Sequence, residues 1–93
     1  MNNLQDLIDE AKLSRCDGVD YEYRKGFVEA LNFAIRKHKE QWDIEDFKKD
    51  LIETEINLSS FKNCEYADGI LGGLKTNIKI LEELQLQWQL QTN

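Results

Sequence analysis

Residues 23–40 read YRKGFVEALNFAIRKHKE, and residues 66–83 read YADGILGGLKTNIKILEE. The two stretches align without a gap at an offset of 43 positions. The identical pairs are Tyr23/Tyr66, Gly26/Gly69, Leu31/Leu74, Ile35/Ile78 and Glu40/Glu83. The same offset places Leu4 on Phe47 and Ile8 on Leu51, so the segments that precede the two stretches also correspond. The repeat predicts one structural unit that occurs twice.

The apolar residues of both units follow helical spacing. In the first segment they recur at i, i+3, i+4 and i+7, which is typical of a helix with one buried face. These residues are Leu4, Leu7, Ile8 and Ala11. The expected helices cover about residues 2–15, 20–41, 43–57 and 59–91. The predicted fold is all-α: a small helical bundle of two tandem helical hairpins, approximately 1–41 and 42–90, in a single domain over 1–93 with a long C-terminal helix.

Local signals predict where the later helices begin. Asp43 can accept hydrogen bonds from the first turn of the third helix, and Trp42 and Phe47 have the spacing of a hydrophobic staple around that cap. Ser59-Ser60 is expected to cap the fourth helix, whose apolar stripe begins at Cys64. The segment 84–91 alternates apolar and polar residues with period two, as a strand would. Leu and Gln favour helices and no other segment offers a strand partner, so we expect helix there.

Two small-residue pairs need an explanation, because glycine inside a helix costs about 0.5–1 kcal/mol relative to alanine. Gly26 and Ala30 are four positions apart, as are Gly69 and Gly73, so each pair lies on one face of its helix. Small residues at this spacing allow two helix backbones to approach closely. We therefore expect the second and fourth helices to cross at these four residues, which is a packing role.

Composition excludes several classes of protein. The chain has 93 residues, of which 41% are hydrophobic and 32% charged, and it contains no proline. This excludes disordered and collagen-like chains. No apolar run reaches the roughly 18 residues of a membrane span, and no signal peptide is apparent, so we expect no membrane association and a cytoplasmic location. The formal net charge of −6 argues against direct binding of nucleic acid, which usually requires clustered Lys and Arg.

Few residues of this chain are of the types that form catalytic or metal-binding sites. A zinc site needs four Cys or His ligands at close spacing, but the chain has Cys16 and Cys64 far apart and one histidine, His38. Neither Gly26 nor Gly69 lies in the sequence pattern of a phosphate-binding loop. Scattered carboxylates fall on helix faces that we expect to be solvated; examples are Asp6, Glu10, Asp46 and Asp50. We therefore expect no enzyme activity, no catalytic, cofactor-binding or metal-binding residue, and no cofactor.

The pattern Y-x-x-G-x-x-x-A-L, followed by Ile and a charged tail, occurs at residues 23–35 and in weaker form at 66–78. It resembles a segment in many small bacteriophage and prophage accessory proteins. The resemblance implies origin rather than activity, because short acidic chains of this kind look like phage products that bind host proteins. Anti-defence proteins, anti-CRISPR inhibitors among them, are one such group. The cytoplasm of a bacterial host would then be the location.

These observations leave three functions open. The first is a non-catalytic protein-binding module, a phage-encoded inhibitor of a host protein or defence complex. The second is a self-associating structural or assembly protein. The third is a helix-turn-helix transcription regulator, which the acidic charge disfavours. We also expect a homodimer, because helix 20–41 is apolar on many sides and the C-terminal helix ends in apolar residues. The candidate interface residues are Leu84, Leu86, Trp88 and Leu90.

Overall fold

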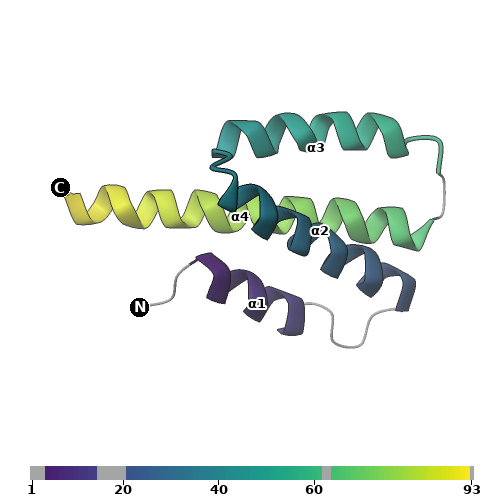
Figure 1. Ribbon diagram of the computed structural model, residues 1–93, viewed down its shortest axis with the longest axis horizontal. Coiled ribbons are helices and arrows are strands. Elements are labelled where there is room, and N and C mark those ends of the chain that lie inside the picture. Colours follow the sequence, from purple (N-terminus) through teal and green to yellow (C-terminus); the bar gives the residue numbers. More distant parts are fainter. Residues whose placement is uncertain (1–3, 15–20, 62–63, 93) are drawn as a thin grey trace.

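The structure is a computed structural model that describes residues 4–14, 21–61 and 64–92. It contains four helices, and no strand occurs in these ranges. The helices are α1 (Leu4–Ser14), α2 (Tyr21–Lys39), α3 (Ile44–Leu58) and α4 (Glu65–Thr92). The predicted all-α bundle is confirmed, and the ambiguous segment 84–91 continues α4 as helix. α2 and α4 run in the same direction, whereas α1 and α3 run in the opposite one (Figure 1).

The start of α3 forms as the sequence predicts. Asp43 accepts a hydrogen bond from the Asp46 backbone N–H at 2.9 Å, and the Asp46 side chain accepts one from the Asp43 backbone N–H at 3.0 Å. This reciprocal capping box satisfies two donors that a helix start otherwise leaves unpaired. The rings of Trp42 and Phe47 lie 5.3 Å apart across the cap. They fix the angle at which the chain enters α3.

The predicted start of α4 is wrong. Ser59 is the C-cap of α3, where its hydroxyl and its backbone N–H both donate to the Ile56 carbonyl oxygen, the hydroxyl at 2.7 Å. Because Ser59 ends one helix, it cannot begin the next, and α4 starts at Glu65. Cys64 is half-buried and precedes this start, where its carbonyl accepts from the Asp68 N–H at 3.0 Å. The predicted start of α2, at about residue 20, lies outside the described residues.

α2 and α4 form the centre of the bundle and cross at the small residues. A Cβ atom added to Gly26 would overlap the Tyr66 carbonyl oxygen, and one added to Gly69 would overlap the Tyr23 carbonyl oxygen. One turn further along, a Cβ added to Gly73 would lie 2.7 Å from the Cβ of Ala30. The structure thus places Gly26, Ala30, Gly69 and Gly73 where the two backbones touch.

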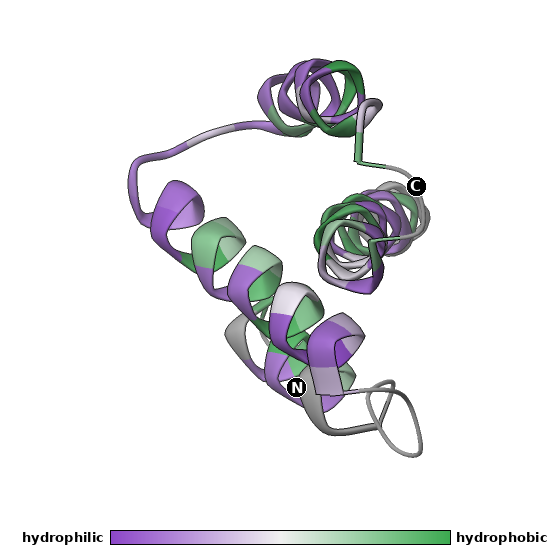
Figure 2. Cartoon of the chain, turned by 90° about the vertical axis from the view of Figure 1, so that its right-hand side faces the viewer, coloured by the Kyte–Doolittle hydropathy of each residue, from purple (hydrophilic) through white to green (hydrophobic). Residues whose placement is uncertain are grey.

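Two apolar clusters flank this crossing. One joins α1 to α2 through the buried residues Ile8, Ala11, Phe27 and Leu31. The other joins α2, α3 and α4 through Ala34, Phe47 and Ile78. Seen along the bundle, α3 stands apart from α2 while both approach α4 (Figure 2). This separation opens the site described next.

Candidate binding cleft between α2 and α3

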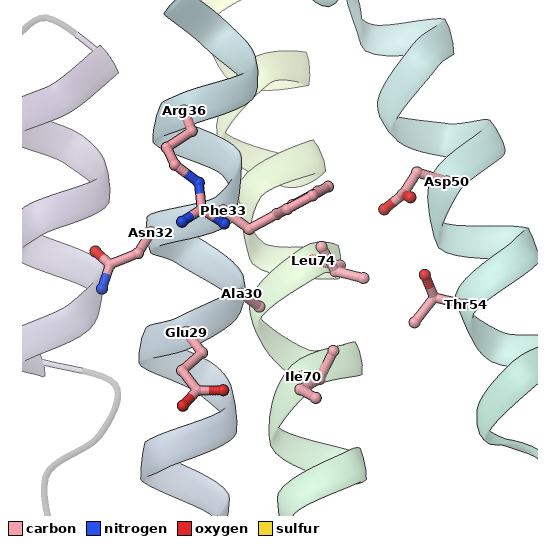
Figure 3. Close-up of a pocket in the computed structure, with 9 residues that line it drawn as sticks. All are labelled: Glu29, Ala30, Asn32, Phe33, Arg36, Asp50, Thr54, Ile70 and Leu74. Carbon is pink, nitrogen blue, oxygen red and sulfur yellow. The ribbon is translucent and has the colours of Figure 1, made fainter.

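An open cleft of about 500 Å³ lies between α2 and α3, with α4 as its floor. Phe33 of α2 points across the floor, beside Ile70 and Leu74 of α4, and the Asp50 and Thr54 side chains point in from α3 (Figure 3). Glu29 and Arg36 stand along the α2 edge. The cleft therefore has an apolar floor, one polar wall and a charged rim. Its volume falls in the range of about 300–1,000 Å³ that is usual for ligand pockets.

The same groove occurs a second time in the repeat, where it is nearly closed. At the equivalent place α1 packs against α4, and the remaining pocket, lined in part by Leu7, Ala11 and Thr76, measures about 180 Å³. The backbone of α1 lies close to both α2 and α4. The backbone of α3 lies close to α4, but no Cα atom of α3 is within 8 Å of one in α2, two helices that the structure describes in full. Near its first turn α3 still touches α2 through the Phe47 side chain, which packs with Ala34 and His38. One half of the repeat is packed, and the other is open.

Two positions at which the units of the repeat differ in sequence account for one groove being nearly closed and the other open. The offset of 43 positions places Asp50 where α1 has Leu7, and Thr54 where α1 has Ala11. Leu7 and Ala11 can be buried against a neighbouring helix, whereas a carboxylate and a hydroxyl without partners are costly to bury. Asp50 and Thr54 are only half-buried. Polar side chains at two packing positions therefore keep α3 away from α2.

The surroundings of Asp50 in the cleft shift the pKa of its carboxyl group. Partial burial and the nearby Glu53 carboxylate raise the pKa of Asp50, and Lys37 opposes them with a smaller effect. Within the part of the chain that the structure describes, Asp50 makes no hydrogen bond or ion pair. A cation or hydrogen-bond donor that entered the cleft would thus find an acceptor beside an apolar floor. The sequence analysis placed Asp50 on a solvated face, and the structure places it, half-buried, in the wall of the open cleft.

The two ends of the cleft are fixed by different contacts. At one end the Tyr66 hydroxyl donates to the Glu29 carboxylate, a hydrogen bond that raises the pKa of Tyr66. At the other end the Trp42 ring packs edge-on against Phe33 at 5.9 Å. The Lys37 ammonium lies over both rings, 5.5 Å from Phe33 and 5.1 Å from Trp42. Contacts of this kind hold the floor residue Phe33 in place.

A second polar feature lies in the core beside α3. His38 Nε2 is 3.1 Å from Asn77 Oδ1, and its ring packs 4.7 Å from that of Phe47. Partial burial lowers the pKa of His38, and the hydrogen bond with Asn77 opposes this with a smaller effect. Asn77 is fully buried, and its Nδ2 has no hydrogen-bond partner among the described atoms. The repeat has Leu81 and Ala34 at the corresponding positions. This polar pair thus distinguishes the two halves of the core.

The structure also shows an exposed apolar surface on the outer face of α3. Ile52 is 61% exposed and Ile56 is 67% exposed. The interface residues that the sequence analysis predicts lie on a different segment, at the C-terminal end of α4. There Leu84 is half-buried and Leu86 is 57% exposed, while the side chains of Trp88 and Leu90 lie outside the described set. The helical spacing of the sequence could have revealed this surface, because Ile52 and Ile56 lie off the face of α3 that carries Phe47 and Leu51.

The remaining features concern metal binding, the other carboxylates and membrane spans. Among the described residues, no three His, Cys, Asp or Glu side chains are close enough together to hold a metal ion. The carboxylates of Asp6, Glu10 and Asp46 are exposed on helix faces. None of the described helices is both long and apolar enough to span a bilayer.

Comparisons with protein-family models, with curated protein sequences and with solved structures give no match to this chain.

Proposed function

We propose that this protein is a non-catalytic protein-binding module and that its partner inserts side chains into the cleft between α2 and α3. The observation that carries the proposal is the pair Asp50 and Thr54. The first unit of the repeat has Leu7 and Ala11 at these positions, and both can pack against a neighbouring helix. With Asp50 and Thr54 in their place, α3 does not pack against α2 along the cleft. Lost packing that leaves an apolar floor open is a usual feature of binding surfaces.

The shape and chemistry of the cleft support a protein partner. The cleft opens beside the middle of α3, and the other side of this helix carries the exposed Ile52 and Ile56. Small-molecule sites bury most of their ligand, and this cleft is open to solvent. The partner in this proposal is a host protein. The narrower form, a phage inhibitor of a host defence complex, rests on the resemblance of the tyrosine–glycine helix motif.

A capture experiment with a blocked cleft tests this proposal. Thr54→Trp places a large side chain in the cleft, and Lys75→Trp places the same side chain on an exposed part of α4. The tagged wild type and the Lys75→Trp variant should each retain one bacterial protein at stoichiometric level from a lysate, and Thr54→Trp should not. The proposal is wrong if no stoichiometric protein is retained, or if Thr54→Trp retains it as well as the wild type does.

Self-association is the second candidate function. The observation that favours it is that the exposed isoleucines of α3 and the open cleft belong to the same chain.

A further inference from the structure

The cleft contains a carboxylate whose charge has no partner in the described part of the chain. Asp50 is half-buried in the wall that α3 forms, and among the described residues it makes no hydrogen bond or ion pair. The other carboxylate of the cleft, that of Glu29, accepts a hydrogen bond from the Tyr66 hydroxyl. A charge that is partly removed from water and left unpaired destabilises the folded chain. A cation supplied by a partner would remove this cost.

The charges on α3 make the surroundings of Asp50 acidic. A second hollow, of about 300 Å³, adjoins the cleft, and Asp50 lines both. The other charged groups that line this hollow are the carboxylates of Asp46 and Glu53 and the ammonium of Lys49. Lys37, which acts on Asp50 from α2, is bound at 3.2 Å to the glutamate three positions further along. The negative charges around Asp50 therefore outnumber the positive ones, and they favour a cation beside it.

Arg36 is the base on the opposite edge of the cleft. It stands on α2, across from Asp50, and is exposed (Figure 3). No ion pair joins it to Asp50. Charge pairs at exposed positions contribute only about 0–1 kcal/mol, and the contribution rises when the charges are shielded from water. The half-buried Asp50, and not the exposed Arg36, therefore decides which charge a partner brings into the cleft.

The floor of the cleft distinguishes between the two basic side chains. Phe33, Ile70 and Leu74 form an aromatic and aliphatic surface beside the wall that carries Asp50. A guanidinium group is planar and weakly hydrated, packs on aromatic rings and donates two parallel hydrogen bonds to one carboxylate, whereas an ammonium group is compact and strongly hydrated. Thr54, which points into the cleft one turn after Asp50, offers a hydroxyl acceptor for a further N–H. This surface suits arginine better than lysine.

We infer that the partner places an arginine side chain in the cleft, with the guanidinium against the Asp50 carboxylate and a neighbouring apolar side chain on Ile70 and Leu74. The inference rests on the proposed binding role of the cleft and states the chemistry of the group that fills it. A charge match of this kind orients the partner and disfavours acidic segments at the same place.

Three peptides test this inference without the partner protein. Each is an acetylated and amidated tripeptide with isoleucine first, leucine last, and arginine, citrulline or glutamate between them. Citrulline has the length of arginine and keeps N–H donors, but it carries no charge. In a nuclear magnetic resonance titration of the wild type, the arginine peptide should bind about tenfold more tightly than the citrulline peptide, as expected for one charge-assisted contact. It should shift the signals of the Asp50 carboxyl carbon and of the Phe33, Ile70 and Leu74 side chains.

Two variants show whether the preference comes from Asp50. Asp50→Asn removes the charge from the cleft and should abolish the difference between the arginine and citrulline peptides. Glu55→Gln is the matched control, because it removes a carboxylate from an exposed position of the same helix. It should keep the preference for arginine. The comparison separates binding at Asp50 from the general attraction of a cationic peptide to an acidic chain.

The inference is overturned if the citrulline peptide binds the wild type as tightly as the arginine peptide does, or if the preference persists in Asp50→Asn. It is also overturned if the arginine peptide leaves the cleft signals unchanged at millimolar concentration, or if the glutamate peptide binds most tightly, which would place charge recognition at Arg36. The capture experiment remains separate. A host protein that Asp50→Asn retains in full and Thr54→Trp loses would support the proposed function while it overturns the assignment of arginine.

Discussion

Gly26 and Gly69 occupy equivalent positions on the two sides of the crossing between α2 and α4. Each lies against the backbone of the tyrosine that stands three positions before the other glycine: Gly26 against Tyr66, and Gly69 against Tyr23. Their next neighbours are equivalent as well, because added Cβ atoms would lie 3.0 Å from the backbone nitrogens of Ile70 and of Phe27. The contact is thus a local two-fold arrangement within a single chain.

This geometry predicts the effect of adding one methyl group. Gly26→Ala and Gly69→Ala should each lower the free energy of unfolding by about 1–3 kcal/mol, because backbone atoms of the opposite helix cannot move aside cheaply. Gly72→Ala is the matched control. Its Cβ would meet the hydroxyl end of the Tyr23 side chain, which can rotate. Alanine also favours helix by up to about 1 kcal/mol, so this variant should be as stable as the wild type or more so.

Urea unfolding followed by circular dichroism measures all three variants. Equal stabilities for Gly26→Ala, Gly69→Ala and Gly72→Ala would contradict the close crossing.

Asp50 predicts a pH-dependent effect at the cleft. Its pKa is raised in the folded chain, so the favourable contribution of its protonated form is complete below the unfolded pKa of 3.8 and is lost as the pH rises through the folded pKa. Asp50→Asn stays neutral and should stabilise the protein at pH 7 by about 0.5 kcal/mol, with no gain near pH 3. Glu55→Gln removes the same charge from an exposed position of α3 and serves as the control. A gain that is equal at both pH values would show that burial of the carboxylate is not its cause.

His38 should make the fold sensitive to mild acid. Burial lowers its pKa below the usual value of 6.5, so the folded chain takes up the proton less readily than the unfolded chain does. The contribution of neutral His38 is complete above the unfolded pKa and is lost as the pH falls through the folded pKa. The free energy of unfolding should therefore decrease between about pH 7 and pH 5.

His38→Gln keeps a hydrogen-bonding side chain next to Asn77 but cannot titrate, so it should flatten this dependence. Thermal unfolding at several pH values gives the comparison. A constant difference between the wild type and His38→Gln across this range would exclude His38 as the source.

Much of the fold could be predicted from the sequence because its signals are local or repeated. The apolar spacing indicated the helices, Asp43 marked the start of α3, and the two pairs of small residues indicated the crossing. The start of α4 could not be predicted, because a serine caps the end of one helix as well as the beginning of another. Ser59 found its acceptor in the last turn of α3.

The cleft was harder to predict, because it results from a contact that does not form. Asp50 and Thr54 resemble ordinary solvated residues when α3 is considered alone. They become informative only when α3 is compared with α1, where Leu7 and Ala11 stand in their place. The exposed isoleucines were missed for a related reason, since an apolar residue on a helix is expected to face the core.

The central claim is that Asp50 and Thr54 keep α3 away from α2 and so create the binding cleft. It is tested most directly by the distance between nitroxide labels at Lys25→Cys on α2 and Asn57→Cys on α3, in a chain whose two native cysteines are replaced by serine. The distance should be shorter in the variant Asp50→Leu/Thr54→Ala than in the chain with Asp50 and Thr54. That variant carries the residues of α1, and its α3 should close onto α2. An unchanged distance would contradict the account.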